Sequence, residues 1–360
     1  LPNQGVNQMK KLLLSLAMLS GTSAMAADEL HLYNWNNYIA PETVKQFESE
    51  CKCKLVQDYY GSMEEMLAKL AAGAKGYDLL VPTGFALEPL LKQGKLAGLD
   101  KARLPNLKNI SRQYLDTAFD KGNQYSVPYA FTTTIIGYND ARLKEAGVSV
   151  DGWATVFDPK VLQKIKGKVT VLDDPREVFV AALKYLGYPA NSTDEAQWKA
   201  AQQVILQAKP YWAAFNSQSY IKELTVGNIW VAHGYSNDFF QANQDTKAAK
   251  RPFSIVPVLP KEGASLSLDS MVLLKNAPRP DLAYKFVNFM LEGKNSAVLT
   301  NMTGSGNPNS DALKYVKPEL TKMSSVFPSA AQSSKLEMLK DQDAKTRRLM
   351  NRMWTEIKVK

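Results

Sequence analysis

The sequence predicts an α/β protein with two lobes joined by crossover strands. Strand-like and helix-like segments alternate through the first half of the chain, which is typical of a parallel sheet. Extended runs then lead into a second set of such segments, and further extended runs lead back. About 330 residues follow an N-terminal leader, which is enough for two domains with cores of their own. Two or three strands shared between two lobes suit a cleft that closes on a ligand.

The first lobe shows repeated strand–helix units. In chain order these are a strand over 30–35, a helix over 41–50, a strand over 54–60, a helix over 62–72, a buried strand over 77–81 and a helix over 85–93. Pro41 opens the first helix, and Gly94 closes the last one. Units of this length predict right-handed crossovers between parallel strands.

The second half of the chain forms the other lobe and then returns. Extended runs over 125–129 and 133–138 precede a strand over 168–172, helices over 175–187, 194–208 and 218–226, a strand over 229–232 and a helix that begins near 238. The return uses extended runs over 253–257 and 265–274, a helix over 281–292 and a charged amphipathic helix over 336–358.

A leader precedes the first strand. From Met9 the chain has two lysines, an apolar run over 12–19 and the small-residue pattern Ala24-Met25-Ala26. These features predict a signal peptide that is cleaved after Ala26, with residues 1–26 absent from the mature protein. A membrane anchor is the alternative, but the apolar run is far shorter than the ~20 residues that span a bilayer. We therefore expect a free, periplasmic protein.

The charge balance is basic without a dense basic patch. The chain has 44 Lys and Arg and 35 Asp and Glu, a net charge of +9, of which Lys10 and Lys11 lie in the leader. Basic clusters such as those at 247–251 and 345–348 are interpreted as solvated helix faces. Because export also argues against nucleic acid, we expect no nucleic-acid partner.

Two cysteines, Cys51 and Cys53, are separated by one residue. A bridge across so small a ring would be strained, whereas an exported thiol pair is prone to oxidise. The sequence leaves their redox state open. With only two histidines in the chain, a metal site with soft ligands is not expected.

Catalytic and nucleotide-binding signatures do not occur. The chain has no Gly-x-x-x-x-Gly-Lys-Ser/Thr loop, no Gly-x-Gly-x-x-Gly after a strand and no Gly-x-Ser-x-Gly elbow. We expect neither an enzyme nor a cofactor. An exported hydrolase stays an alternative, because a pair of carboxylates can catalyse without further groups.

Several residues are candidates for a ligand site. Trp35 and Tyr38 follow the first strand, at the end where open α/β sheets bind ligands, although both could be core aromatics. Asp269 lies in an otherwise apolar strand and needs a partner. From the residues alone, Glu177 fits a capping pattern and Asp238 fits an N-cap.

Eight motifs in order resemble one family, the periplasmic polyamine-binding proteins of ABC importers. The motifs are YNWNNYIAP at 33–41, GYDLLVP at 76–82, VPY at 127–129, IGYN at 136–139, DPREVF at 174–179, GYSND at 234–238, PKEGA at 260–264 and FVNF at 286–289. The resemblance covers essentially the whole mature chain.

The resemblance implies a fold and a division into lobes. The fold is the two-lobed periplasmic binding protein fold of the type II-like kind, with a ligand cleft between the lobes. We expect residues 27–134 and 258–310 in lobe 1, residues 135–257 in lobe 2, and residues 311–360 as a helical segment that packs across both lobes.

The resemblance also implies a ligand and a set of contacts. The expected ligand is a polyamine of the putrescine or spermidine type, with carboxylates pairing with its ammonium groups and aromatic faces packing on its methylenes. The expected contact residues are Trp35, Asn36, Tyr38, Thr83, Glu177, Tyr235, Asp238 and Asp269. The expected partners are an inner-membrane ABC permease and its cytoplasmic ATPase, and the protein is expected to act as a monomer.

Three positions depart from the family pattern. Asn37 replaces a common aspartate, while Ser267 and Ser305 stand where an aromatic is usual or expected. These departures leave other ligands open: agmatine, or an amino acid resembling GABA. A signalling receptor for amines is the alternative to a transport protein.

Overall fold

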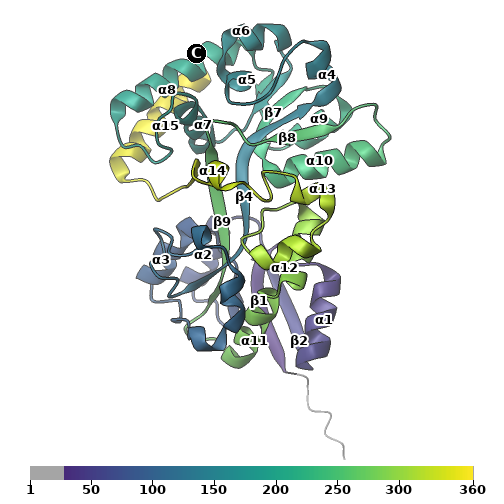
Figure 1. Cartoon of the computed structure of the whole chain (residues 1–360). Coiled ribbons are helices and arrows are strands. Elements are labelled where there is room, and N and C mark those ends of the chain that lie inside the picture. The colour runs from purple at the N-terminus through teal and green to yellow at the C-terminus, as the bar shows by residue number, and fades with distance from the viewer. Residues whose placement is uncertain (1–27, 360) are drawn as a thin grey trace, which may run out of the picture.

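The computed structural model describes residues 28–359 and has two lobes connected by long strands (Figure 1). The strand β4 (Ser126–Asn139) runs through the junction. Its first part pairs with the antiparallel strand β9 (Ala264–Leu273), and its second part pairs with β7 (Val231–Tyr235) and β8 (Ile255–Val258). One strand therefore belongs to the sheets of both lobes, as expected for crossover strands.

The first lobe has the predicted strand–helix order. Its elements are β1 (Glu29–Trp35), α1 (Pro41–Cys51), β2 (Lys54–Tyr60), α2 (Met63–Ala71), β3 (Leu79–Leu80) and α3 (Leu87–Lys92). The strand β1 is central, because it pairs in parallel with β2 on one side and with β3 on the other. Parallel pairing places the carboxyl ends of these strands at one edge of the sheet.

The second lobe is built around β5 (Val169–Val171), which pairs in parallel with β7 and with β6 (Ala214–Phe215). Its helices are α4 (Asp140–Glu145), α5 (Ala154–Phe157), α6 (Pro159–Leu162), α7 (Pro175–Tyr185), α8 (Glu195–Ala208), α9 (Tyr220–Val226) and α10 (Ser236–Ala248). The core of this lobe is aromatic, with Trp153 and Trp198 fully buried.

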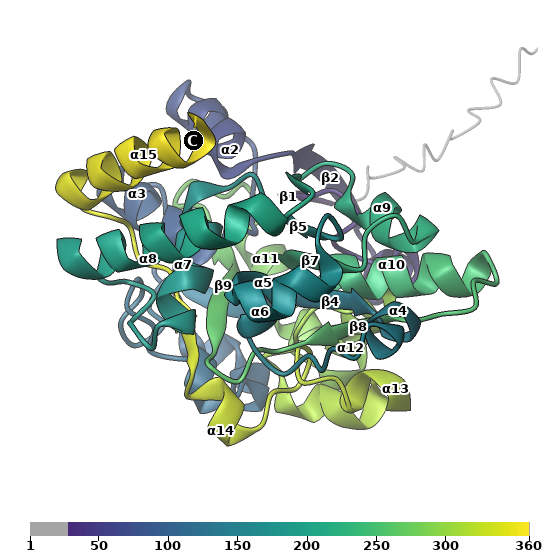
Figure 2. The ribbon, with the colours of Figure 1, turned by 90° about the horizontal axis from the view of Figure 1, so that it is seen from above.

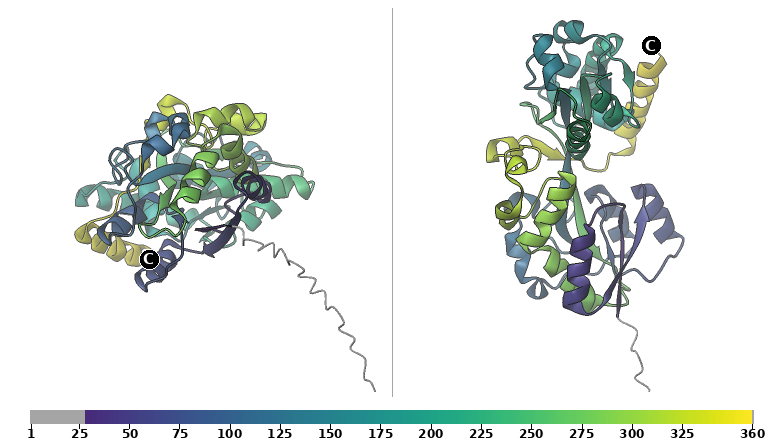
Figure 3. Two further views of the ribbon diagram at one scale, coloured as in Figure 1. Left: turned by 90° about the horizontal axis from the view of Figure 1, so that it is seen from below. Right: turned by 90° about the vertical axis from the view of Figure 1, so that its right-hand side faces the viewer.

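The chain then returns to the first lobe and crosses back. The helices α11 (Pro280–Met290) and α12 (Gly293–Thr303) pack in the first lobe, and α13 (Pro318–Thr321) and α14 (Ala330–Ser333) follow. The last helix, α15 (Ala344–Val359), lies beside α7 and α8 of the second lobe (Figure 2). The side view shows the path of this C-terminal segment from one lobe to the other (Figure 3).

The C-terminal segment differs from the sequence prediction of one helix over 336–358. Residues Leu336–Met338 form the strand β10, which pairs in parallel with the start of β9, and α15 begins only at Ala344. The free edge of β9 offers backbone hydrogen bonds that a sequence periodicity does not reveal. Asp343 accepts hydrogen bonds from the backbone and side chain of Thr346, which marks the true start of the helix.

The limits of several strands also differ from those predicted from the sequence. The two predicted runs over 125–129 and 133–138 merge into β4, with a register shift between Pro128 and Ala130. The predicted strand over 77–81 shortens to β3, and the strand predicted over 229–232 lies two to three residues later, as β7. These are short strands whose limits depend on their partners rather than on local sequence.

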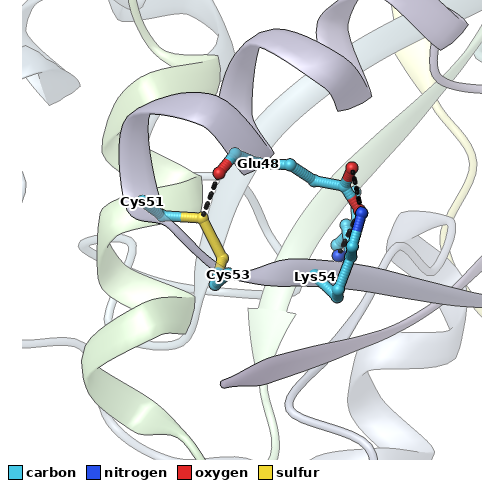
Figure 4. Close-up of a disulfide and its surroundings, with 5 residues drawn as sticks. Glu48, Cys51, Cys53 and Lys54 are labelled. Atoms are coloured by element: carbon cyan, nitrogen blue, oxygen red, sulfur yellow. Dashed lines mark hydrogen bonds and ion pairs between the residues drawn. A yellow bond between two sulfur atoms is a disulfide. The ribbon is translucent and has the colours of Figure 1, made fainter. Parts of the chain in front are cut away.

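A disulfide joins Cys51 and Cys53 at the turn between α1 and β2 (Figure 4). Lys52 between them has a φ of 54°, in the left-handed region, so the chain reverses at that residue. The Glu48 carboxylate accepts hydrogen bonds from the Leu55 backbone and from Lys54. The structure thus answers the redox question that the sequence left open.

The predicted signal peptide over 1–26 lies outside the described residues. Within residues 28–359, no helix is both long and apolar enough to cross a membrane.

Candidate ligand-binding site

A cavity of about 810 Å³ lies at the junction of the two lobes. Its walls come from the loop after β1, the start of α2, the residues after β3, the start of α7, the junction of β7 and α10, and β9. Seven of the eight residues predicted from the sequence line it: Trp35, Asn36, Tyr38, Thr83, Glu177, Tyr235 and Asp269. The fold therefore brings together side chains that are far apart in the chain.

Asp269 is the central carboxylate of the first-lobe side. Its side chain is buried, with the residue 8% exposed. Oδ1 accepts a hydrogen bond of 2.6 Å from Thr83 Oγ1, and Oδ2 accepts one of 2.8 Å from the Tyr38 hydroxyl. Burial raises the pKa of Asp269 to about 6, although these two donors partly offset the increase. Both partners are neutral, so the carboxylate has no compensating charge from them.

The strand β9 explains how an aspartate reaches the cavity. Side chains at alternate positions of a strand point to the same face, so Ser265, Ser267 and Asp269 share one face. Leu266 and Leu268 pack in the core of the first lobe. The polar face of one core strand thus forms part of the cavity wall.

Aromatic rings hold the loop after β1 in place. The Tyr38 ring meets Tyr129 edge-on with ring centres 5.5 Å apart, and the Tyr129 hydroxyl donates to the Tyr38 carbonyl oxygen at 2.5 Å. Trp35 packs on Tyr60 with ring centres 4.8 Å apart. Asn36 between them is exposed to the cavity. These contacts fix two aromatic faces and one amide at the mouth of the site.

Glu177 faces the cavity from the second lobe, at the third residue of α7. The cap of this helix is Asp174, which accepts hydrogen bonds from the backbone N–H groups of Arg176 and Glu177. The Glu177 carboxylate is buried and accepts a hydrogen bond of 2.8 Å from Ser265 Oγ. Burial, and then the nearby Asp174, raise the pKa of Glu177 to about 7. Glu177 therefore lies in the capped first turn of α7 and also faces the cavity.

Asp238 is the one predicted residue that does not line the cavity. Its carboxylate accepts a hydrogen bond from the Tyr220 hydroxyl, which in turn accepts one of 3.2 Å from the Tyr235 backbone N–H. Burial raises the pKa of Asp238. The helix begins at Ser236, so Asp238 is its third residue and not its N-cap. In this structure Asp238 lies behind Tyr235 and does not reach the cavity.

The sequence reasoning missed several residues of the wall. These are Glu64, Phe85, Phe119, Asp174, Arg176, Asn237, Met338 and Leu339, together with Gly61, Ser62, Met63, Gly84, Thr132, Leu266 and Leu268. Asp174 and Arg176 belong to the motif DPREVF at 174–179, so their place in the cavity wall next to Glu177 could have been predicted from the sequence. Phe119 lies against Gly84, where a Cβ atom would be 2.4 Å from the ring, and no local pattern announces such a contact.

The three departures from the family pattern lie in different places. Ser267 lines the cavity, so the missing aromatic leaves open space there. Ser305 is buried and bonded to Thr303, and it is not part of the wall. Asn37 has a φ of 54°, a conformation that asparagine tolerates better than most residues, and it lies outside this cavity. Phe85 and Phe119 supply apolar surface that Ser267 and Ser305 do not.

Within the part of the chain that the structure describes, no group of three or more His, Cys, Asp or Glu side chains could hold a metal ion. The cavity wall carries carboxylates, hydroxyls, amides, aromatic faces and the guanidinium of Arg176. This donor set suits a cation with N–H groups and an apolar body.

The comparison with known families decides the class of protein. The family described as bacterial extracellular solute-binding protein matches residues 42–327. This chain belongs to that family. Its members bind solutes and are not enzymes, so the expectation of binding without turnover is confirmed by family membership.

Individual relatives of this solute-binding protein cover nearly its whole length. A putrescine/cadaverine-binding protein of Pseudomonas aeruginosa is 56% identical over 98% of this chain and 100% of its own. The putrescine-binding periplasmic protein PotF of Escherichia coli is 37% identical over 95% of each chain. These relatives confirm the family resemblance stated from the motifs.

A solved structure confirms the fold. The spermidine/putrescine ABC transporter substrate-binding protein PotD from Streptococcus pneumoniae superposes with a TM-score of 0.86 at 25% identity, over 92% of this chain and 99% of that one. The predicted two-lobed fold of this solute-binding protein is therefore correct.

Proposed function

We propose that this solute-binding protein captures a short alkyl diamine of the putrescine type between its lobes and delivers it for uptake. The observation that carries the proposal is a pair of buried carboxylates, Asp269 and Glu177, that face one cavity from its two sides. Aromatic side chains line the same cavity. A dication with an apolar chain complements this arrangement in charge and in polarity.

Neither carboxylate forms a salt bridge in the part of the chain that the structure describes, although the nearby Arg176 guanidinium acts to lower the pKa of Glu177. None of the ion pairs formed within residues 28–359 includes Asp269 or Glu177. Burying a charge is costly unless it is paired and hydrogen-bonded. An ammonium group that enters the cavity would supply the missing charge at each end.

The strand β9 gives the length scale of the site. Ser265, which binds Glu177, and Asp269 are four residues apart on one face of the strand, a spacing of about 13 Å at ~3.3 Å per residue. A spacing of this size leaves room for a short alkyl chain with an ammonium group at each end. Ser267 and Thr132 face the middle of this span with small hydroxyl side chains.

The names of the relatives agree with this ligand class. The 56% identical protein binds putrescine and cadaverine by name, and PotF binds putrescine by name. We extend this class to the present chain because its cavity contains two carboxylates and the aromatic side chains of Trp35, Tyr38 and Tyr235.

The biological setting is part of the proposal. Export through the leader over 1–26 would place the mature protein in the periplasm, and N-terminal sequencing of the exported protein tests cleavage after Ala26. Closure of lobe 1 (27–134 and 258–310) on lobe 2 (135–257) would present the loaded form to an inner-membrane ABC permease driven by a cytoplasmic ATPase. The segment 311–360 would brace both lobes, and the protein would act as a monomer.

One observation favours a second candidate ligand, an amino acid resembling GABA. Arg176 lines the cavity next to Glu177, and its guanidinium donates a hydrogen bond to the Lys340 carbonyl. A guanidinium in the wall could bind a carboxylate at one end of a ligand. Arg176 already donates to a backbone carbonyl, whereas neither carboxylate forms a salt bridge within residues 28–359, so the diamine is favoured.

Calorimetric titration tests the proposal. The mature protein would be titrated with putrescine, cadaverine, spermidine, spermine, agmatine, GABA and arginine. Tight binding of a diamine with weak or absent binding of GABA is the expected result. Tight binding of GABA instead would overturn the diamine and favour the amino acid, and failure of all amines to bind would overturn the ligand class.

A further inference from the structure

Asn237 lies in the wall of the cavity with an amide oxygen that has no partner. It is the second residue of α10, between Tyr235 and Asp238, and it lines the cavity together with Glu177. Among residues 28–359, no donor bonds to Asn237 Oδ1, although that atom is buried. A buried acceptor without a hydrogen bond is costly and calls for an explanation.

The neighbours of Asn237 in the first turn of α10 all have roles within the fold. Ser236 Oγ accepts a hydrogen bond from the Thr133 backbone N–H. Asp238 accepts one from Tyr220. Asn237 is thus the polar side chain of this turn that the fold itself does not use, and it is the one that faces the cavity.

We propose that Asn237 is a ligand-binding residue whose amide turns, when the ligand enters, so that Oδ1 faces the cavity and accepts a hydrogen bond from the ammonium group held at the second-lobe end. This inference rests on the proposed function. An ammonium group has three N–H donors, and one carboxylate seldom satisfies all three. Glu177 supplies the charge, and Asn237 supplies a second, neutral acceptor.

Asp238 then has a supporting role in this conformation. Tyr220 ties its carboxylate and the Tyr235 backbone together behind the wall, and the Tyr220 ring lies under Gly234, where a Cβ atom would be 2.5 Å from it. Tyr220 and Asp238 position the start of α10, while Asn237 touches the ligand.

Two substitutions test the contact in the full mature chain. Asn237→Leu removes the acceptor while keeping the size, and we expect the Kd for putrescine to rise about tenfold or more. Asn237→Asp keeps the acceptor and adds a charge, and we expect the Kd to fall about threefold, with a steeper dependence on salt. Gln241→Leu is the matched control, because Gln241 is an exposed amide on the same helix, and its Kd should not change.

The outcomes separate this inference from the proposed function. Wild-type affinity in both Asn237 variants would overturn the inference alone. Failure of the wild-type protein to bind any diamine would overturn both. Thermal unfolding of each variant accompanies the titration, and if Asn237→Leu does not fold, the change in affinity of Asn237→Asp decides the question.

Discussion

The Tyr38 hydroxyl donates a hydrogen bond of 2.8 Å to Asp269 Oδ2, although 231 positions separate the two residues. Tyr38 lies in the loop after β1, and Asp269 lies on the strand that returns from the second lobe. Thr83 binds the other carboxylate oxygen from the residues after β3. Three separate segments therefore fix one carboxylate in place, and a ligand that uses it need not pay for its ordering.

The first prediction concerns binding. Asp269→Asn removes the charge but keeps the shape, so we expect putrescine affinity to fall by about 3 kcal/mol or more, because a buried ammonium would lose its counter-charge. Calorimetry measures this. Asp281→Asn is the control, since Asp281 forms an exposed ion pair with Arg103 and neither residue lines the cavity. Unchanged affinity in Asp269→Asn would contradict the assignment.

The same substitution should stabilise the protein without ligand. Burial raises the pKa of Asp269 to about 6, so the folded state holds its proton more tightly than the unfolded chain does. The resulting cost is absent below about pH 4 and complete above pH 6. We expect Asp269→Asn to raise the free energy of unfolding at pH 8 by about 1–3 kcal/mol, as measured by urea denaturation. If the variant has a lower free energy of unfolding than the wild type at pH 8, burial of the ionised Asp269 carboxylate does not destabilise the fold.

The second carboxylate adds a pH dependence to binding. The pKa is raised to about 6 at Asp269 and to about 7 at Glu177, and an ammonium ligand needs both groups ionised. We therefore expect affinity to rise from pH 5.5 to pH 8, and binding near pH 6.5 to release protons. Titrations in buffers with different ionisation enthalpies measure the proton release. A Kd that is constant over this range would be inconsistent with the two raised pKa values.

The parts of the site that the sequence predicted are those carried by local motifs. Trp35 ends a strand, Tyr38 follows it, and Glu177 lies in the first turn of a helix, so the places of these three residues in the fold follow from elements that can be predicted from the sequence. Asp269 was identifiable because a carboxylate in an apolar strand is unusual.

The parts that escaped prediction depend on contacts between distant segments. Phe119 and Met338 reach the cavity through the packing of irregular chain and through pairing of β10 with β9, and neither has a sequence period that indicates it. Asp238 matches the family motif, but in this structure it accepts a hydrogen bond from Tyr220 and does not line the cavity, so its contact with a ligand stays a prediction.

The disulfide between Cys51 and Cys53 should contribute little to stability. It closes a very small ring, and the stabilisation from a crosslink grows with the length of the closed loop. We expect the double substitution Cys51→Ala and Cys53→Ala to lower the free energy of unfolding by about 1–2 kcal/mol. Diamine affinity should be unchanged, because neither cysteine lines the cavity. A loss well above this range, or a loss of binding, would mean that the turn supports the site.

His233 should make the protein sensitive to acid. It is 1% exposed, Nδ1 accepts a hydrogen bond of 3.4 Å from the Leu172 backbone, and the ring packs against Trp153. Burial lowers the pKa of His233 to about 3, whereas histidine in an unfolded chain titrates near ~6.5. Between these values the unfolded chain binds a proton that the folded protein does not. His233 therefore makes stability fall as the pH falls, by up to about 1.4 kcal/mol per pH unit.

The variant His233→Gln isolates this effect, because glutamine retains an acceptor for the Leu172 N–H and does not titrate. Asp269 and Glu177 change stability in the opposite direction over part of the same range, so the difference between variant and wild type is the quantity to measure. We expect the variant to be less stable at pH 8 and the gap to narrow below about pH 6.5. Urea denaturation from pH 4.5 to 8 measures the gap. A gap that stays constant over this range would mean that His233 is protonated equally in the folded and unfolded states.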